Sequence, residues 1–121
     1  MKRYRIGEFA KQMGVSIDFI KYYESEGVIR SVQDPRNRYH YYDFSQSKLV
    51  QMIQCYRSFG FSAQDVVTLL RHADNSEVIR LFDEKEQVHR RRILDSTHIT
   101  AQLGFMAHAL RAEPDGTWYI I

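Results

Sequence analysis

Hydrophobic residues near the start of the chain recur every three to four positions, which is the spacing of an amphipathic helix. This spacing predicts a first helix over residues 7–13, ended by Gly14, after a short opening strand over residues 4–6. Ser16 is a good N-cap for a second short helix, which Gly27 ends. The inward-facing positions are Ile6, Phe9, Ala10, Phe19, Ile20 and Tyr23. Two short helices joined by a tight turn predict a helix-turn-helix.

The pattern then changes to an alternation with a period near two, which predicts β-strands. One candidate strand covers residues 28–32 and another covers residues 39–42. The loop between them, residues 33–38, contains aspartate, proline and asparagine, which favour turns. We therefore expect a β-hairpin, or wing, with two arginines at its tip, where packing does not require them.

Two more helices are predicted after the hairpin. Asp43 with Gln46 has the spacing of a capping box, and Gly60 closes the helix that this box opens. Ser62 with Asp65 repeats the spacing at the start of a shorter helix. The apolar positions on the buried faces of these helices are Leu49, Ile53, Tyr56, Ala63, Val66, Val67 and Leu70. The predicted fold class is therefore mainly α, with one small hairpin.

The last regular segment is a long helix over residues 76–111, capped by Asp74 with Glu77. Such a helix would be roughly 54 Å long, whereas a domain of this size is only about 30 Å across. Its apolar positions include Val78, Leu81, Phe82, Val88, Ile93, Ile99, Leu103, Met106 and Leu110. Their spacing is close to a heptad repeat but is broken at Lys85 and Arg92, which predicts pairing with a partner over part of the length.

A homodimer is the simplest way to cover this helix. The candidate dimerisation residues are Val88, Ile99, Leu103, Met106 and Leu110. The alternative is a helix packed wholly against its own domain. The chain has few other elements that could cover such a helix. The chain therefore divides into residues 1–74, a dimerisation helix over 75–112 and a tail over 113–121. The tail predicts a turn and a strand over 116–121, either as a lid or as the start of a missing effector domain.

Composition narrows the class of protein. The 121 residues are 44% hydrophobic and 26% charged, as in an ordinary globular domain. No apolar run approaches the ~20 residues of a membrane span, and no secretion signal follows the basic N-terminus. The single cysteine, Cys55, makes no internal disulfide, which fits a reducing compartment. We expect a cytoplasmic protein with no membrane partner.

Net charge is only +2, but its distribution is uneven. Residues 1–42 carry eight basic and five acidic side chains, whereas residues 43–121 carry nine and ten. The excess positive charge therefore lies with the helix-turn-helix and the hairpin, as contact with DNA phosphates requires. The candidate contacts on these two elements are Lys21, Tyr22, Arg36 and Arg38.

The second strand of the hairpin is rich in aromatic residues. Tyr39 and Tyr41 alternate onto one face of it, and His40 and Tyr42 alternate onto the other. One of these faces must pack on the domain, so at most half of the cluster can contact DNA.

Four short motifs follow one another in the order found in the MerR family of bacterial transcription regulators, which residues 3–72 closely resemble. The motifs are IGEFAK at residues 6–11, IKYYESEG at 20–27, RYHYYD at 38–43 and YRSFGFS at 56–62. The long helix after them agrees with the family in kind.

The resemblance implies a winged helix-turn-helix domain and an antiparallel coiled coil of two long dimerisation helices. It implies a homodimer on double-stranded promoter DNA that bends and untwists the DNA in response to an effector, here an unknown small molecule. RNA polymerase is then engaged indirectly, through the DNA. The full set of candidate DNA-binding residues is Lys11, Ser16, Asp18, Lys21, Tyr22, Arg36, Arg38, Tyr39, His40 and Tyr41.

Three positions depart from the family pattern. Lys21 stands where the family usually has arginine, and lysine cannot make arginine's bidentate contact with a base. In the wing, His40 replaces a common arginine and Arg38 replaces a common glycine. The basic contact of the wing is therefore shifted by two residues.

Other chemistry has little support. Cys55 is a candidate thiol sensor, because family members that respond to aldehydes and thiol stress carry a cysteine at a similar place; the alternative is a small buried hydrophobe. The histidines are scattered and the long helix has no cysteine at its ends, so no metal and no cofactor are predicted. No catalytic constellation can be assembled, so an enzyme is not expected. The alternative function is an excisionase-like or architectural DNA-binding factor without effector sensing.

Overall fold

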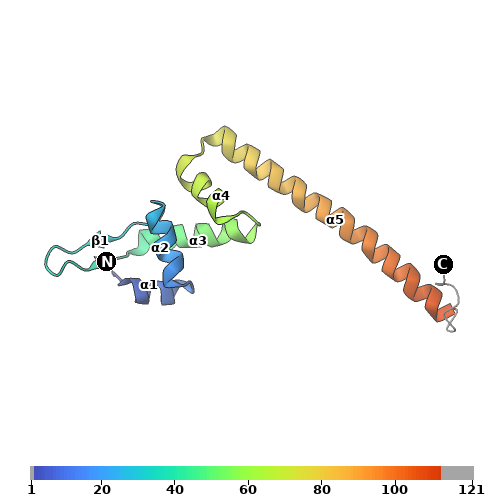
Figure 1. Cartoon of the computed structure of the whole chain (residues 1–121), viewed down its shortest axis with the longest axis horizontal. Helices are drawn as coiled ribbons and strands as arrows, with labels where there is room; N and C mark the ends of the chain where they lie inside the picture. Colours follow the sequence, from blue (N-terminus) through green and yellow to red (C-terminus); the bar gives the residue numbers. More distant parts are fainter. Residues whose placement is uncertain (1, 113–121) are drawn as a thin grey trace. The chain divides into compact units, whose positions relative to one another are not determined.

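The computed structural model describes residues 2–112, which form two compact units, the first ending at Arg80 and the second beginning at Leu81. The elements in chain order are α1 (Ile6–Met13), α2 (Ile17–Ser25), β1 (Val32–Gln33), β2 (His40–Tyr41), α3 (Phe44–Ser58), α4 (Ala63–Val67), the π-helical turn η1 (Thr68–His72) and α5 (Asn75–Ala112). In the first unit the β1–β2 hairpin extends beyond the helices at one end, and α1, α2 and α3 lie beside its base (Figure 1).

The helix-turn-helix forms as predicted. α1 ends at Gly14, whose φ of 68° lies in the left-handed region that favours glycine. The Ser16 hydroxyl accepts a hydrogen bond from the backbone N–H of Phe19 at 3.0 Å and so caps α2. Ile20 and Tyr23 point from α2 into the core, which fixes its outer face toward solvent.

The hairpin is shorter than its sequence predicts. β1 and β2 pair in antiparallel fashion over two residues each. The predicted strand over residues 28–32 is confirmed only at Val32, which begins β1. It is wrong over 28–31, because the backbone N–H groups of Val28 and Ile29 donate to the carbonyl of Tyr23 at 2.8 and 3.2 Å. That stretch therefore finishes α2, and it buries both apolar side chains in the core instead of alternating them.

The chain before α1 adds a single bridge to this small sheet. Tyr4 and Tyr42 exchange two backbone hydrogen bonds, of 2.9 and 2.8 Å. The opening strand predicted over residues 4–6 is wrong beyond this one bridge, since Ile6 already begins α1.

α3 begins differently from the prediction. Asp43 caps it by accepting a hydrogen bond from the backbone N–H of Ser45 at 3.0 Å. The capping box predicted with Gln46 is wrong, because Gln46 Oε1 accepts instead from the backbone N–H of Arg30 at 2.7 Å. The amide therefore ties the start of α3 to the segment that follows α2.

The core of the first unit collects side chains from every helix up to α4. Ser62 and Asp65 form the predicted capping box, which starts α4 and directs Val66 and Val67 inward. The buried hydrophobic side chains are Phe9, Ala10, Ile20, Tyr23, Val28, Ile29, Tyr42, Val50, Ile53, Phe61, Val66 and Val67.

α5 is one continuous helix of 38 residues, about 57 Å long, and it confirms the predicted long helix. The Asp74 carboxylate accepts from the backbone N–H of Glu77 at 2.9 Å, as predicted. Within the second unit, the part of α5 from residue 81 to residue 112 has no buried residue. Coverage by a partner and coverage by the first unit both stay predictions. Within residues 2–112, no helix is both long and apolar enough to cross a membrane. The turn and strand predicted over 116–121 lie outside the described residues.

Candidate nucleic-acid interface

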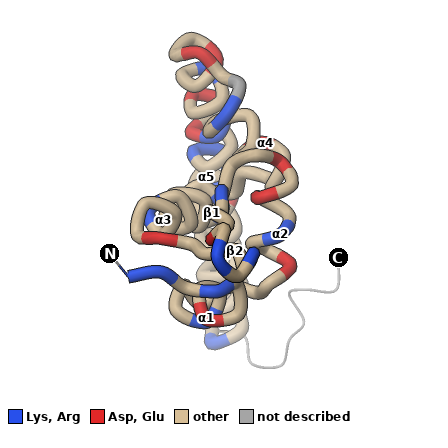
Figure 2. Tube along the Cα trace, turned by 90° about the vertical axis from the view of Figure 1, so that its left-hand side faces the viewer, with Lys and Arg blue, Asp and Glu red and all other residues tan. Residues whose placement is uncertain are grey.

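A hollow lies between α2 and the wing, and three separate parts of the chain line it. Arg5 comes from the segment before α1, Lys21 from α2, and Arg38 and His40 from the hairpin. Three permanent positive charges therefore face one carboxylate, that of Glu24. We name this hollow the α2–wing hollow. Figure 2 shows blue segments, which mark Lys and Arg, in the chain before α1 and in the hairpin. Such a surface suits a phosphate backbone.

A hydrogen-bond network joins α2 to the wing at this hollow. The Glu24 carboxylate accepts from the Tyr42 hydroxyl at 2.5 Å and from the Ser31 hydroxyl at 2.6 Å. The Ser31 oxygen also lies 2.9 Å from Nδ1 of His40. Burial, aided by the neighbouring Glu24 carboxylate, raises the pKa of Tyr42 well above its usual value, so this hydroxyl remains a donor. The network fixes the recognition helix and the wing relative to one another.

Two arginines from the segment before α1 stack on the wing. The Arg3 guanidinium lies 4.2 Å from the centre of the Tyr41 ring, and that of Arg5 lies 3.8 Å from the centre of the Tyr39 ring. Cation–π contacts at exposed sites contribute about 0.5–1 kcal/mol each. Tyr42, on the opposite face of the strand, is only 2% exposed, which confirms that one face of the aromatic cluster packs on the domain.

Asp34 anchors the tip of the wing. Its carboxylate is 5% exposed and accepts from the Arg36 backbone N–H at 2.9 Å, from the Arg36 guanidinium at 3.3 Å and from that of Arg3 at 3.3 Å. The Arg36 bonds, backbone first, lower the pKa of Asp34 to about 2, so the carboxyl is ionised at neutral pH. Arg36 therefore has a partner within the chain, although its side chain remains 84% exposed.

Arg38 adopts a backbone conformation that favours glycine. Its φ is 62°, and its N–H donates to the carbonyl of Asp34 at 2.7 Å. A non-glycine residue in the left-handed region costs roughly 1–3 kcal/mol. Glycine would adopt this backbone conformation without strain, yet the chain has a long cationic side chain here. This favours a role for the Arg38 charge in binding.

The remaining predicted DNA-binding residues lie outside the α2–wing hollow. They are Lys11, Ser16, Asp18, Tyr22, Arg36 and Tyr41. The Ser16 hydroxyl is engaged as the cap of α2, whereas Lys11 and Asp18 are exposed on α1 and α2. The Tyr22 ring packs edge-on against Tyr23, at 4.9 Å between centres, and is 38% exposed.

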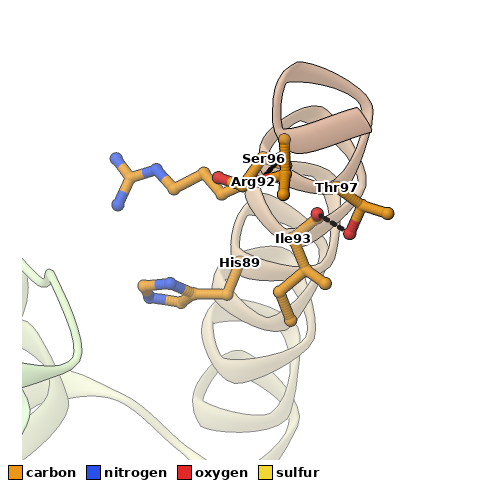
Figure 3. A pocket seen from close by; sticks show the side chains of 6 residues that line it. His89, Arg92, Ile93, Ser96 and Thr97 are labelled. Carbon is orange, nitrogen blue, oxygen red and sulfur yellow. Dashed lines mark hydrogen bonds between the residues drawn. The ribbon is translucent and has the colours of Figure 1, made fainter. Parts of the chain in front are cut away.

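A second hollow on α5 is not a ligand cavity. Its lining residues, among them His89, Arg92 and Ile93, all come from one helix, so it has no second wall (Figure 3). The Thr97 hydroxyl donates back to the Ile93 carbonyl at 2.8 Å, and that of Thr100 to the Ser96 carbonyl at 2.7 Å. The polar groups here belong to a helix surface.

Cys55 is exposed on α3 as a free thiol, so the interpretation of this residue as a small buried hydrophobe is wrong. Its role as a thiol sensor stays a prediction. In the part of the chain that the structure describes, no group of three histidine, cysteine, aspartate or glutamate side chains could hold a metal ion.

Sequence reasoning missed five residues of this region: Arg3, Arg5, Glu24, Ser31 and Asp34. A signal for the two arginines was present, since they alternate with a period of two, as do the tyrosines on which they stack. No local pattern marks Glu24 and Ser31, because their partners lie 18 and nine residues away along the chain.

Together, the short recognition helix, the hairpin beside it and the cationic hollow between them define a winged helix-turn-helix protein with a surface suited to DNA. Residues 4–73 match the family model described as MerR HTH family regulatory protein. The chain belongs to this family of DNA-binding transcription regulators, which confirms the resemblance and disfavours the excisionase-like alternative.

Individual relatives agree with this assignment. A mercuric resistance operon regulatory protein from Serratia marcescens is 27% identical over 110 residues, which span 86% of this chain and 76% of the relative. Among solved structures, EcmrR in its complex with DNA has a TM-score of 0.67 and 21% identity, over 92% of this chain and 41% of that chain. HiNmlR, a MerR family regulator lacking the sensor domain and bound to promoter DNA, has a TM-score of 0.62 and 18% identity, over 93% and 94%. These structures confirm the predicted fold class.

Proposed function

We propose that the chain acts as a homodimer that places two winged helix-turn-helix heads on promoter DNA and distorts that DNA in response to an effector. The α2–wing hollow is the observation that carries this proposal, because it gathers Arg5, Lys21 and Arg38 from three segments beside an outward-facing recognition helix. The solved structures of EcmrR and HiNmlR are complexes with DNA, which supports the same use of the fold here.

The proposed contacts follow from the geometry. Lys21 and Arg38 bind phosphates on either side of the hollow, and Arg5, stacked on Tyr39, adds a third cation. Tyr22 and Lys11 contact the backbone outside the hollow. Arg36 serves first as the counter-ion of Asp34, so we assign it a smaller share of the DNA affinity than the sequence alone suggests.

The proposed dimer is formed by α5. Val88, Ile99, Leu103, Met106 and Leu110 are between 43% and 62% exposed, although they follow one another along one face of the helix. An antiparallel pairing with a second copy would bury this row. Residues 1–74 are then the DNA-binding domain and 75–112 the dimerisation helix.

The effector is proposed to be a small molecule. The name of the Serratia marcescens relative refers to mercury, and soft metals of this kind are bound by several thiolates. These 121 residues contain one cysteine, and that thiol is exposed on α3. RNA polymerase is reached through the distorted promoter. We propose that the protein has no catalytic activity. We also propose that it lies in the cytoplasm, where promoter DNA is accessible.

The test begins with selection of a tight duplex from a random pool, followed by titration of that duplex at several salt concentrations. For the unaltered chain, we expect affinity to fall steeply with salt. Lys21→Ala and Arg38→Ala are each expected to weaken binding and to reduce the log–log salt slope by roughly one per lost contact. Arg91→Ala, which removes the same charge from the exposed surface of α5, is the matched control and should change neither quantity.

A chain that enriches no duplex, or whose affinity is independent of salt, would contradict the proposed function. Equal losses for Lys21→Ala and Arg91→Ala would show that net charge, and not the α2–wing hollow, drives the binding.

A further inference from the structure

We infer that Ser31 and Glu24 are positioning residues that hold His40 as a phosphate-binding group of the wing, in a form that must take up a proton to bind DNA. The inference rests on the proposed function and names a specific property of the same surface. The observation that carries it is the network from Tyr42 through Glu24 and Ser31 to His40.

The direction of each hydrogen bond in this network is set by the supply of protons. An ionised carboxylate only accepts hydrogen bonds, so Glu24 accepts one from the Tyr42 hydroxyl and one from the Ser31 hydroxyl. A serine hydroxyl has a single hydrogen to donate, and that of Ser31 is already donated to Glu24. The contact of 2.9 Å between Ser31 and His40 is therefore made by an N–H on Nδ1 of the imidazole, which donates to the Ser31 oxygen.

A neutral imidazole has only one N–H group. When that group is on Nδ1 of His40, the other ring nitrogen, Nε2, carries a lone pair. Among the described residues, only Ser31 forms a hydrogen bond with this ring, and the side chain is exposed. A lone pair on Nε2 repels a phosphate oxygen, which also accepts. Only the protonated ring presents an N–H at Nε2, and that N–H would form a charge-assisted bond with phosphate.

The surroundings favour an incoming phosphate and leave histidine as the titrating side chain. The other charged or titratable side chains that line the hollow are Arg5, Lys21, Glu24, Arg38, Tyr39 and Tyr42. Among the side-chain types that line the hollow, histidine is the one that proteins use as a switch near neutral pH. DNA binding at this hollow is therefore coupled to the protonation of His40.

The first experiment measures affinity for the selected duplex from pH 6 to pH 8 at constant ionic strength, by fluorescence anisotropy. For the unaltered chain, we expect Kd to rise about fivefold or more per head over this range. His40→Gln removes the titrating group and should bind weakly, with little pH dependence. His40→Arg carries a permanent charge and should bind tightly at every pH. The four other histidines are unchanged in both variants, so they serve as the internal control.

A second experiment tests the positioning role of Ser31. Without the hydroxyl, a neutral His40 ring is free to carry its proton on Nε2 and to donate it to phosphate. Ser31→Ala should therefore reduce the pH dependence of Kd, while Ser31→Thr, which keeps a hydroxyl, should preserve it. Calorimetry in two buffers of different ionisation enthalpy should show up to one proton fewer taken up per protomer for Ser31→Ala at pH 7. Thermal melts of both variants verify that they remain folded.

The outcomes separate this inference from the proposed function. A chain that binds the duplex with a salt slope but gives the same pH profile with His40→Gln as without it would overturn the inference alone. Equal pH profiles for Ser31→Ala and the unaltered chain would remove the positioning role. Failure to bind duplex DNA at any pH would overturn both.

Discussion

The first unit and α5 use their hydrophobic residues in opposite ways. In the first unit, Ile20 and Ile53 are completely buried, whereas in α5 Ile93 and Leu103 are 65% and 62% exposed. Most helical stability in proteins comes from the packing of an apolar face, and an isolated helix gains none of it. The head therefore contains its own core within one chain. The described part of the second unit is a single helix, so its apolar row has no core to join within that unit, which is why we propose a second copy.

The largest effect is expected where this comparison predicts a partner. Leu103→Asp together with Leu110→Asp would place carboxylates in the proposed seam, and burial of unpaired charge is prohibitive. We expect monomers in sedimentation velocity at micromolar concentration, with unchanged helicity in the head. Leu94→Asp is the control, because Leu94 is 70% exposed and lies on a different face from the apolar row. If the double variant keeps the mass of the unaltered chain, α5 is not the seam.

The second prediction compares the effect of an Ile→Ala substitution on stability in the core of the first unit and in α5. Ile53→Ala should lower the free energy of unfolding by about 2–5 kcal/mol, because it leaves a cavity in the core. Ile93→Ala removes the same atoms from the exposed helix and should change stability by less than about 0.5 kcal/mol. Chemical denaturation of both variants measures the difference. Similar losses would mean that Ile93 is covered by a partner.

A smaller effect tests the join between α2 and the turn before α5. Gly27 has a φ of +77°, and a Cβ there would lie 2.4 Å from the Arg71 guanidinium. Gly27→Ala should therefore destabilise the head by about 1–2 kcal/mol. The matched variant Gly7→Ala has no atom within 4 Å of its Cβ, and should instead gain about 0.5–1 kcal/mol as a helix position. Thermal melts of the pair should move in opposite directions, and a stabilising Gly27→Ala would contradict the left-handed backbone conformation at Gly27.

The sequence predicted best what depends on near neighbours. Ser16 and Asp74 bond to backbone N–H groups three residues further on, so a local pattern is sufficient to find both caps. The capping box predicted for Gln46 failed for the opposite reason. Its side chain accepts a hydrogen bond from Arg30, which lies 16 residues away, in place of the local bond. The strand prediction over 28–31 failed because the adjacent side chains of Val28 and Ile29 are both buried in the core, whereas a strand would place them on opposite faces.

The candidate site shows the same limit. Lys21 and Arg38 could be found from charge and from motif position, but their meeting around one hollow is a property of the tertiary fold. The burial of Asp34 between Arg3 and Arg36 was also hidden, because a lone aspartate in a turn is ordinary in sequence.

Arg71 connects the recognition helix to the turn that leads into α5. Its guanidinium donates to the carbonyl of Glu26 at 2.7 Å, across 45 residues of chain, and it belongs to the π-helical turn just before α5. This hydrogen bond joins the turn before α5 to Glu26, the C-cap of α2, so a rotation of that turn would act on the end of the recognition helix. An effector that rotates this turn could then reorient the recognition helix without contacting the DNA-binding domain.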